Sequence, residues 1–104
     1  MAVFEYAPAP ESRSIVDIQP TYGLFIDGEF TDPRSGESRK TINPATEEVL
    51  AEVAEADASD VDVAVQAARR AFETVWGPMR GSDRAKYLFR IARIIQERSR
   101  ELAV

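Results

Sequence analysis

The stretch YGLFIDGEFT at residues 22–31 decides how this chain starts to fold. Asp27-Gly28 lies between strand-forming residues and predicts a two-residue β-hairpin turn, because a type I′ turn needs positive φ at both central positions. The turn sets a register in which Phe25 lies opposite Phe30, and an aromatic cross-strand pair of this kind contributes up to about 1 kcal/mol. We therefore expect a tight hairpin centred on Asp27-Gly28.

A second pair of strands is expected after this hairpin. The composition of residues 38–42 predicts a strand. Asn43-Pro44 ends it, because proline has no N–H for a sheet ladder and keeps the preceding residue out of the helical region. Apolar side chains at positions 49, 51 and 53 alternate with their neighbours, which predicts a further strand. The turn between the two strands falls within NPATEEVL (43–50).

The residues from 57 to 78 predict an amphipathic helix with clear limits. Asp57 suits the N-cap position, and Asp60 adds negative charge near the helix start. Trp76-Gly77-Pro78 is expected to end the helix, with Gly77 as a left-handed cap and Pro78 as the stop. The apolar side chains recur at the spacing of one buried face. They are Val61, Ala64, Val65, Ala68, Phe72 and Val75.

A second amphipathic helix is predicted from Ser82, a suitable N-cap, to the end of the sequence. No glycine cap or proline follows Leu102, so the helical pattern has no stop signal. We therefore expect the sequence to be the opening part of a longer polypeptide, truncated within this helix. The apolar face comprises Leu88, Ile91, Ala92, Ile95 and Leu102.

The composition limits the chemistry that this chain of 104 residues can perform. It has no Cys and no His, which removes thiol catalysis, disulfides and the commonest general base and metal ligand. The five glycines are never closer than four positions apart, so the sequence has no glycine-rich phosphate loop. The carboxylates have structural explanations in turns, on a strand face and at a helix start. We therefore expect no catalytic and no cofactor-binding residue in this chain.

The charge distribution and the hydropathy exclude further classes of function. Residues 1–62 carry 14 acidic and 4 basic side chains, a net charge of −10, whereas residues 63–104 carry 4 acidic and 9 basic, a net charge of +5. The basic residues are interleaved with acidic ones, which indicates a solvated helix face and not a nucleic-acid surface. No apolar run approaches the roughly 20 residues of a membrane span, and the first residues lack a signal-peptide pattern. We expect a cytoplasmic protein with no nucleic-acid or membrane partner.

The sequence divides into two segments. Residues 1–21 predict an extended, proline-rich arm, because Pro8, Pro10 and Pro20 fix φ and remove backbone donors. Residues 22–104 carry all the predicted strands and helices. Spacing alone indicates a small α+β piece and no more.

Five segments of residues 22–104 follow one another in a recognisable order. They are GLFIDGEF (23–30), TINPATEEVLAEV (41–53), DVDVAVQAARRAF (60–72), Trp76 and DRAKYLFRIARIIQERSRELA (83–103). They resemble the N-terminal portion of the nucleotide-binding domain of aldehyde dehydrogenases, and the resemblance extends over roughly four-fifths of the chain, everything after the proline-rich arm. The resemblance implies an α/β fold, in which N-terminal β-hairpins and two amphipathic helices form part of a Rossmann-like domain in the intact family.

The resemblance also implies an activity for the complete enzyme. It is the NAD- or NADP-dependent oxidation of aldehydes to carboxylic acids through a cysteine thiohemiacetal, usually in a homo-oligomer. This chain has no Cys, so under the resemblance it is inert alone and plays a structural role. The resemblance places the rest of the site in the remainder of the dehydrogenase, and we expect no cofactor to bind this chain by itself.

One functional role of the family can be placed on residues present here. Some members bind a structural monovalent cation through main-chain oxygens just before the N-P-A-T turn, which implies Thr41 and Ile42 as ligands. Carbonyl oxygen suits a hard cation. An ordinary strand end explains the same two residues.

Three hypotheses therefore fit the sequence. The chain is the N-terminal segment of an NAD(P)-dependent aldehyde dehydrogenase, enzymatic only as part of the whole. Alternatively, it is a truncated paralogue that acts as a protein-binding module on a full-length dehydrogenase. The third hypothesis is an unrelated small α+β protein with a protein partner.

Overall fold

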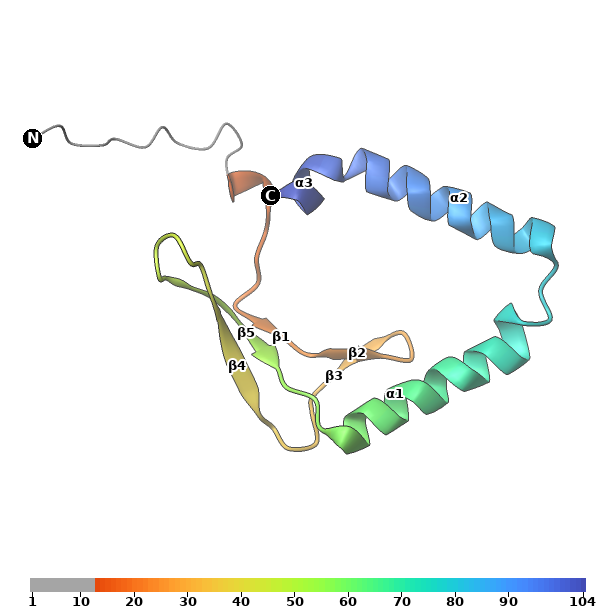
Figure 1. Ribbon diagram of the computed structural model, residues 1–104, viewed down its shortest axis with the longest axis horizontal. Coiled ribbons are helices and arrows are strands. Elements are labelled where there is room, and N and C mark those ends of the chain that lie inside the picture. Colours follow the sequence, from red (N-terminus) through yellow and green to blue (C-terminus); the bar gives the residue numbers. More distant parts are fainter. Residues whose placement is uncertain (1–12) are drawn as a thin grey trace, which may run out of the picture.

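The computed structural model describes residues 13–104, in which strands precede helices in an α+β arrangement (Figure 1). This order confirms the predicted fold class. Most of the proline-rich arm predicted for residues 1–21 lies outside the described residues, and its extent stays a prediction. The elements are η1 (Arg13–Ile15), β1 (Thr21–Tyr22), β2 (Leu24–Ile26), β3 (Glu29–Thr31), β4 (Ser38–Ile42), β5 (Val49–Ala54), α1 (Ala58–Ala71), the π-helical turn η2 (Phe72–Trp76), α2 (Gly81–Glu97) and α3 (Ser99–Ala103).

The predicted hairpin is confirmed in register and in turn geometry. Strands β2 and β3 pair antiparallel, with Phe25 opposite Phe30. The two rings are 5.0 Å apart between centroids and inclined at 59°, a tilted arrangement that aromatic pairs favour. Asp27 and Gly28 have φ values of 56° and 81°, as a type I′ turn requires.

The second predicted pair of strands forms the larger sheet. Strand β5 lies in the middle, antiparallel to β4 and parallel to β1. Between β4 and β5 the chain turns at Asn43, whose N–H donates to the carbonyl oxygen of Glu48 at 2.9 Å. Strand β1 was not predicted, because a two-residue strand has no alternation to read and its pairing depends on residues about thirty positions away.

A capping box starts α1, as the sequence predicts for Asp57. The Asp57 side chain accepts the Asp60 N–H at 2.9 Å, and the Asp60 side chain accepts the Asp57 N–H at 3.1 Å. The second carboxylate oxygen of Asp60 accepts the N–H of Arg34 at 3.2 Å. Asp60 is only 5% exposed. One buried carboxylate therefore joins the turn after β3 to the helix start.

Two predicted helix caps are wrong, and the second helix is not continuous. The first helix ends in the π-helical turn η2, and Gly77 is right-handed, with φ of −62°, so it is not a left-handed cap. The second helix begins at Gly81 with Arg80 at the N-cap, and no side chain caps it, which displaces Ser82 from that role. It is also interrupted at Arg98, where φ is −103° and ψ is 19°. None of the helices among residues 13–104 has the length and apolarity to span a membrane.

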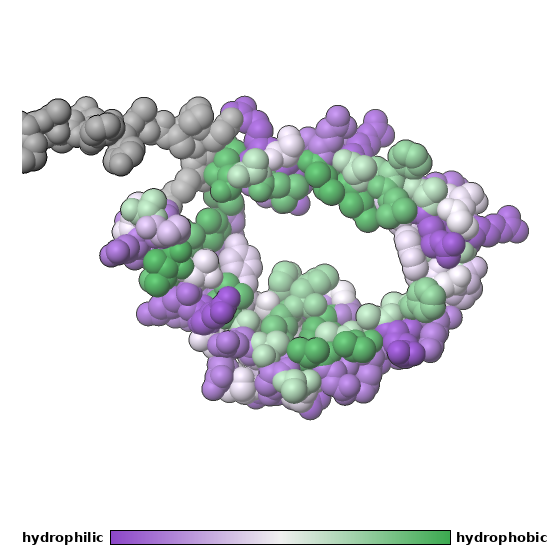
Figure 2. Space-filling view, in the orientation of Figure 1, coloured by the Kyte–Doolittle hydropathy of each residue, from purple (hydrophilic) through white to green (hydrophobic). Residues whose placement is uncertain are grey.

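The strands and helices surround a central opening, which the space-filling view shows (Figure 2). Among residues 13–104, the buried apolar side chains are those of Ala51 in β5 and Ala67 in α1. A chain of this length that formed its own core would bury roughly two-thirds of its unfolded surface. Figure 2 shows hydrophobic residues gathered around the opening along both helices. The described chain therefore presents much of its apolar surface instead of packing it internally.

Candidate functional site

An exposed apolar surface follows α1 and α2. We call it the inner face and define it by Val65 of α1 and Phe72 of η2 together with Leu88, Ile91 and Ile95 of α2. Each of these side chains is between 52% and 60% exposed. The sequence predicts each of them as part of a buried helix face, and Figure 2 shows hydrophobic surface of both helices lining the opening. Five large apolar side chains at helical spacing have the character of a core without a second layer.

The hairpin covers one end of α1 and leaves an apolar groove beside it. The groove has a volume of about 380 Å³ and is lined by Leu24, Phe25, Ile26, Ala56, Asp60, Val61, Ala64, Val65 and Ala68. Its one carboxylate, that of Asp60, already accepts the backbone N–H groups of Arg34 and Asp57, one on each oxygen. The groove thus offers apolar contact and no unused carboxylate for acid–base chemistry.

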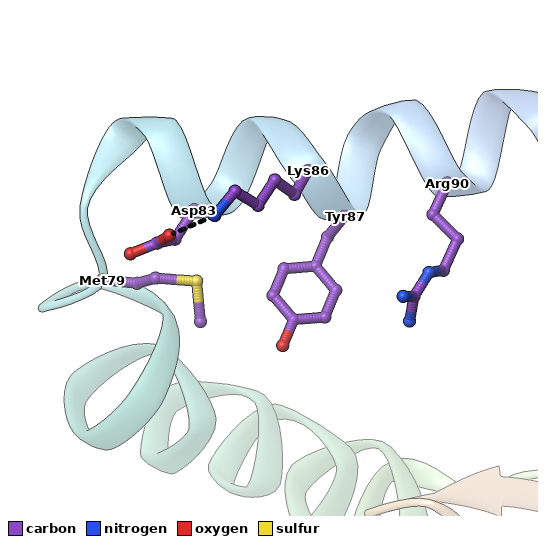
Figure 3. Close-up of a pocket in the computed structure, with 5 residues that line it drawn as sticks. All are labelled: Met79, Asp83, Lys86, Tyr87 and Arg90. Carbon is purple, nitrogen blue, oxygen red and sulfur yellow. Dashed lines mark hydrogen bonds and ion pairs between the residues drawn. The ribbon is translucent and has the colours of Figure 1, made fainter.

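A second pocket lies along the first turns of α2, beside the connection that precedes this helix (Figure 3). It measures about 430 Å³ and is lined by Met79, Asp83, Lys86, Tyr87 and Arg90. Tyr87 and Arg90 point from α2 into the space beside α1 (Figure 3). Lys86 Nζ lies 3.3 Å from Asp83 Oδ1, and both side chains are exposed. An exposed ion pair of this kind contributes about 0–1 kcal/mol and provides no second carboxylate for catalysis.

The predicted cation ligands lie at the end of β4. Thr41 is opposite Ala51 and Ile42 opposite Val49, so the register shifts between Thr41 and Ile42. Main-chain carbonyl oxygen is a ligand that hard cations accept, but the role of Thr41 and Ile42 stays a prediction. Within residues 13–104, no group of three or more acidic side chains is arranged to hold a metal ion.

The shifted pKa values of this chain belong to helix ends and not to a catalytic site. The pKa of Asp57 is lowered, first by the Ser59 hydroxyl, which donates to its carboxylate at 2.6 Å, and then by the Asp60 N–H. The pKa of Glu101 is lowered by the Arg98 guanidinium that hydrogen-bonds to it. Asp57 is exposed and Glu101 is half-buried, and both carboxylates have structural partners.

Sequence reasoning missed the residue that connects the two helices. The Arg84 guanidinium donates to the carbonyl oxygen of Trp76 at 3.3 Å and to that of Gly77 at 3.4 Å. The Trp76 and Tyr87 rings are 6.2 Å apart between centroids. An arginine shortly after a helix-ending Trp-Gly-Pro was the available signal, but the contact depends on the angle between the helices, which periodicity does not give.

Comparisons with known proteins agree in assigning one family. The sequence profile described as the aldehyde dehydrogenase family matches residues 30–104. Aldehyde dehydrogenase 1 of Tanacetum cinerariifolium is 52% identical over 81 residues, which are 77% of this chain and 16% of the relative. The aldehyde dehydrogenase DhaS of Bacillus subtilis, described as a candidate member, is 42% identical over 87 residues, 83% of this chain and 18% of that protein.

Solved structures give the same result. The NAD+ complex of an aldehyde dehydrogenase from Bacillus cereus aligns with a TM-score of 0.75 at 45% identity, covering 80% of this chain and 17% of the other. A mutant of aldehyde dehydrogenase C from Pseudomonas syringae, complexed with NAD+ and octanal, aligns with a TM-score of 0.76 at 45% identity. This alignment covers 85% of this chain and 18% of the other. The present chain therefore spans about a sixth of the length of these relatives.

Proposed function

The chain belongs to the aldehyde dehydrogenase family, and on that premise we propose that it is the N-terminal segment of an NAD(P)-dependent enzyme that oxidises aldehydes to carboxylic acids. The Bacillus cereus relative is described in complex with NAD+ and the Pseudomonas syringae relative with NAD+ and octanal. These descriptions support a nicotinamide cofactor and an aldehyde substrate for the complete enzyme.

The contribution of this segment is structural. The chain has no Cys to act as the family's nucleophile. Its glycines are too widely spaced to cradle a pyrophosphate, so its residues do not fit a nucleotide site. The reactive cysteine, the glutamate that activates water and the NAD or NADP site would all come from the remainder of the dehydrogenase. The strands and helices described here would support that remainder.

The exposure of the inner face is the observation that carries this proposal. Five large apolar side chains are each more than half exposed, although the helical spacing of these residues is that of a buried face. Covering apolar surface contributes roughly 25 cal/mol per Å², so covering five such side chains is worth several kcal/mol. That is comparable with the whole stability of a domain, about 5–15 kcal/mol. The remainder of the enzyme, about four times as long as this chain, is the occupant that the family assignment supports.

A homo-oligomeric, cytoplasmic enzyme completes the proposal. The oligomer is what the family resemblance implies for the complete protein, and analytical ultracentrifugation of that protein tests it. The location is tested by fractionation of cells that express the complete gene. Both the oligomeric state and the location are properties of the complete protein.

A chimeric enzyme tests the proposed role. Residues 22–104 replace the matching segment of the Bacillus cereus relative, and NADH formation from an aldehyde that the parent enzyme oxidises is followed. We expect a rate within about tenfold of the parent, or about 1.4 kcal/mol in activation free energy, because the segment supplies support and not chemistry. Leu88→Asp in the chimera should abolish the activity, whereas Arg93→Asp, on the opposite side of α2, should preserve it. A chimera that keeps the parent's melting temperature and oligomer but has no activity would contradict the proposal.

A further inference from the structure

The connection between α1 and α2 is held by interactions within one short stretch of chain. In η2 the Gly77 N–H donates to the carbonyl oxygen of Phe72 at 2.7 Å, which closes a π-helical turn. A Cβ atom at position 77 would lie 2.6 Å from that same oxygen, closer than real contacts allow. Glycine is thus required here by close approach of the backbone and not by a left-handed conformation.

Arg84 ties the end of the first helix to the start of the second. Its guanidinium donates to the last two carbonyl groups before Pro78, those of Trp76 and Gly77, where a cation is favoured by the helix dipole. On the α2 side, the N–H groups of Asp83 and Arg84 both donate to the carbonyl oxygen of Arg80 at 3.0 Å. The Arg84 side chain therefore links a backbone anchored in α2 to the carbonyl end of η2.

An aromatic contact supports the same geometry. Trp76 from η2 and Tyr87 from α2 place their rings 6.2 Å apart at an inclination of 59°, within the range of favourable tilted pairs. Trp76 and Arg84 are partly buried, whereas every residue from 86 to 100 is exposed. The junction is therefore the best-packed part of the helical half.

We propose that residues 72–87 form a fixed elbow, and that Arg84 is the positioning residue that sets the angle at which α2 leaves α1. Beyond the elbow the two helices diverge around the opening (Figure 1), so their relative direction depends on this junction. The elbow presents both halves of the inner face to one space before anything covers them. Such preorganisation lowers the ordering cost of assembly. The inference rests on the proposed function only in one respect, namely that the rest of the enzyme is what covers the inner face.

The angle can be measured directly, because the chain has no Cys. Spin labels are attached at Arg69→Cys on α1 and Arg90→Cys on α2, and their distance distribution is recorded by pulsed electron paramagnetic resonance on the full 104-residue chain. We expect a single narrow peak for the elbow as it stands. Arg84→Ala should lose that peak and give a broad distribution. Arg93→Ala, an arginine of the same helix outside the elbow, is the matched control and should leave the peak unchanged.

Arg84→Lys keeps the charge, but its shorter side chain replaces the guanidinium whose Nη1 donates to both carbonyl groups, so we expect an intermediate width. A broad distribution in the unsubstituted chain would overturn the fixed elbow, and an unchanged peak in Arg84→Ala would overturn the role of Arg84. Where circular dichroism shows that Arg84→Ala has lost its helices, Arg84→Lys decides the question, and an unchanged peak there contradicts the proposal. A chimera that fails while the chain keeps its narrow peak counts against the proposed function and not against the elbow.

Discussion

The strand half and the helical half of this chain are stabilised in different ways. In the strand half, from β1 through α1, the backbone N–H and C=O groups find hydrogen-bond partners in the sheet ladders, the hairpin and the capping box. The three buried residues Ala51, Asp60 and Ala67 all lie in this half. From η2 onward no described residue is buried. The elbow is the exception in packing, since Trp76 and Arg84 are partly covered.

The difference shows which interactions a segment of a family fold can complete alone. Hydrogen bonds between residues close in sequence form within the segment, because both partners are present. Apolar faces need a second layer, and within residues 13–104 β2 supplies part of one where it lies against α1. The helical half therefore has its direction fixed by the elbow while its surface remains uncovered.

The largest expected effect comes from placing the helical half in a complete enzyme. In the chimera with the Bacillus cereus relative, Leu88→Ala should lower the free energy of unfolding by about 2–5 kcal/mol, the cost of truncating a buried leucine. In the chain alone, where Leu88 is 59% exposed, the change should stay within about 0.5 kcal/mol. Urea unfolding followed by circular dichroism measures both. An equal loss of unfolding free energy in the chimera and in the chain alone would show that the rest of the enzyme does not cover Leu88.

Breaking the capping box tests the strand half. Asp60→Ala leaves the N–H groups of Arg34 and Asp57 without their acceptor in a partly buried site, which should cost about 1–3 kcal/mol in the unfolding free energy of the chain. Asp62→Ala is the matched control, because Asp62 is exposed and its carboxylate accepts from the Gln66 side chain within the same helix. If both variants unfolded at the same urea concentration, Asp60 would not join the turn to the helix.

Replacing glycine by alanine should change the stability in opposite directions in the two halves. Gly28→Ala puts a side chain at φ of 81° and should destabilise the hairpin by about 1 kcal/mol. Gly81→Ala, at the start of α2, meets nothing closer than Arg84 Nη2 at 3.9 Å and should stabilise the chain by up to about 1 kcal/mol, because alanine is the better helix former. Thermal melting of the two variants gives the comparison, and a shift in the same direction would contradict it.

The smallest expected effect is a pH dependence at the start of α1. Folding lowers the Asp57 pKa below its ordinary value of 3.8, through the hydrogen bonds from Ser59 and the Asp60 N–H. The stabilisation is therefore present above pH 3.8 and is lost as the pH falls through the lowered pKa of the folded state. Circular dichroism during acid titration should show the loss of helix displaced to higher pH in Ser59→Ala. An unchanged titration would mean that the Ser59 hydroxyl does not stabilise the carboxylate.

Local signals predicted the strand half almost completely. Asp27-Gly28, Asn43-Pro44 and Asp57 each act through residues within a few positions, and the structure confirms the turns or caps that they predict. Strand β1 could not be predicted, because its two residues pair with β5 through long-range backbone bonds.

The helical half was predicted in pattern but not in arrangement. Periodicity identified the five side chains of the inner face, yet it gave neither the angle between the helices nor the role of Arg84. That angle depends on the π-helical turn and on the right-handed Gly77, where the sequence predicted a left-handed cap. The roles of Thr41 and Ile42 depend on ligands that the family places elsewhere, so they stay predictions.

Thiol accessibility at position 91 tests the central claim most directly. Ile91→Cys and, as the outward-facing control, Arg93→Cys are introduced separately into the chain and into the chimera, and modification of each site is timed by peptide mass spectrometry. In the chain, both sites should react at similar rates, because both positions are exposed. In the chimera, Arg93→Cys should keep its rate while Ile91→Cys becomes at least about tenfold slower, a factor that corresponds to about 1.4 kcal/mol. Protection of Ile91→Cys in the chain alone, or full reactivity in an active chimera, would contradict the claim that the inner face is built to be covered by the rest of the enzyme.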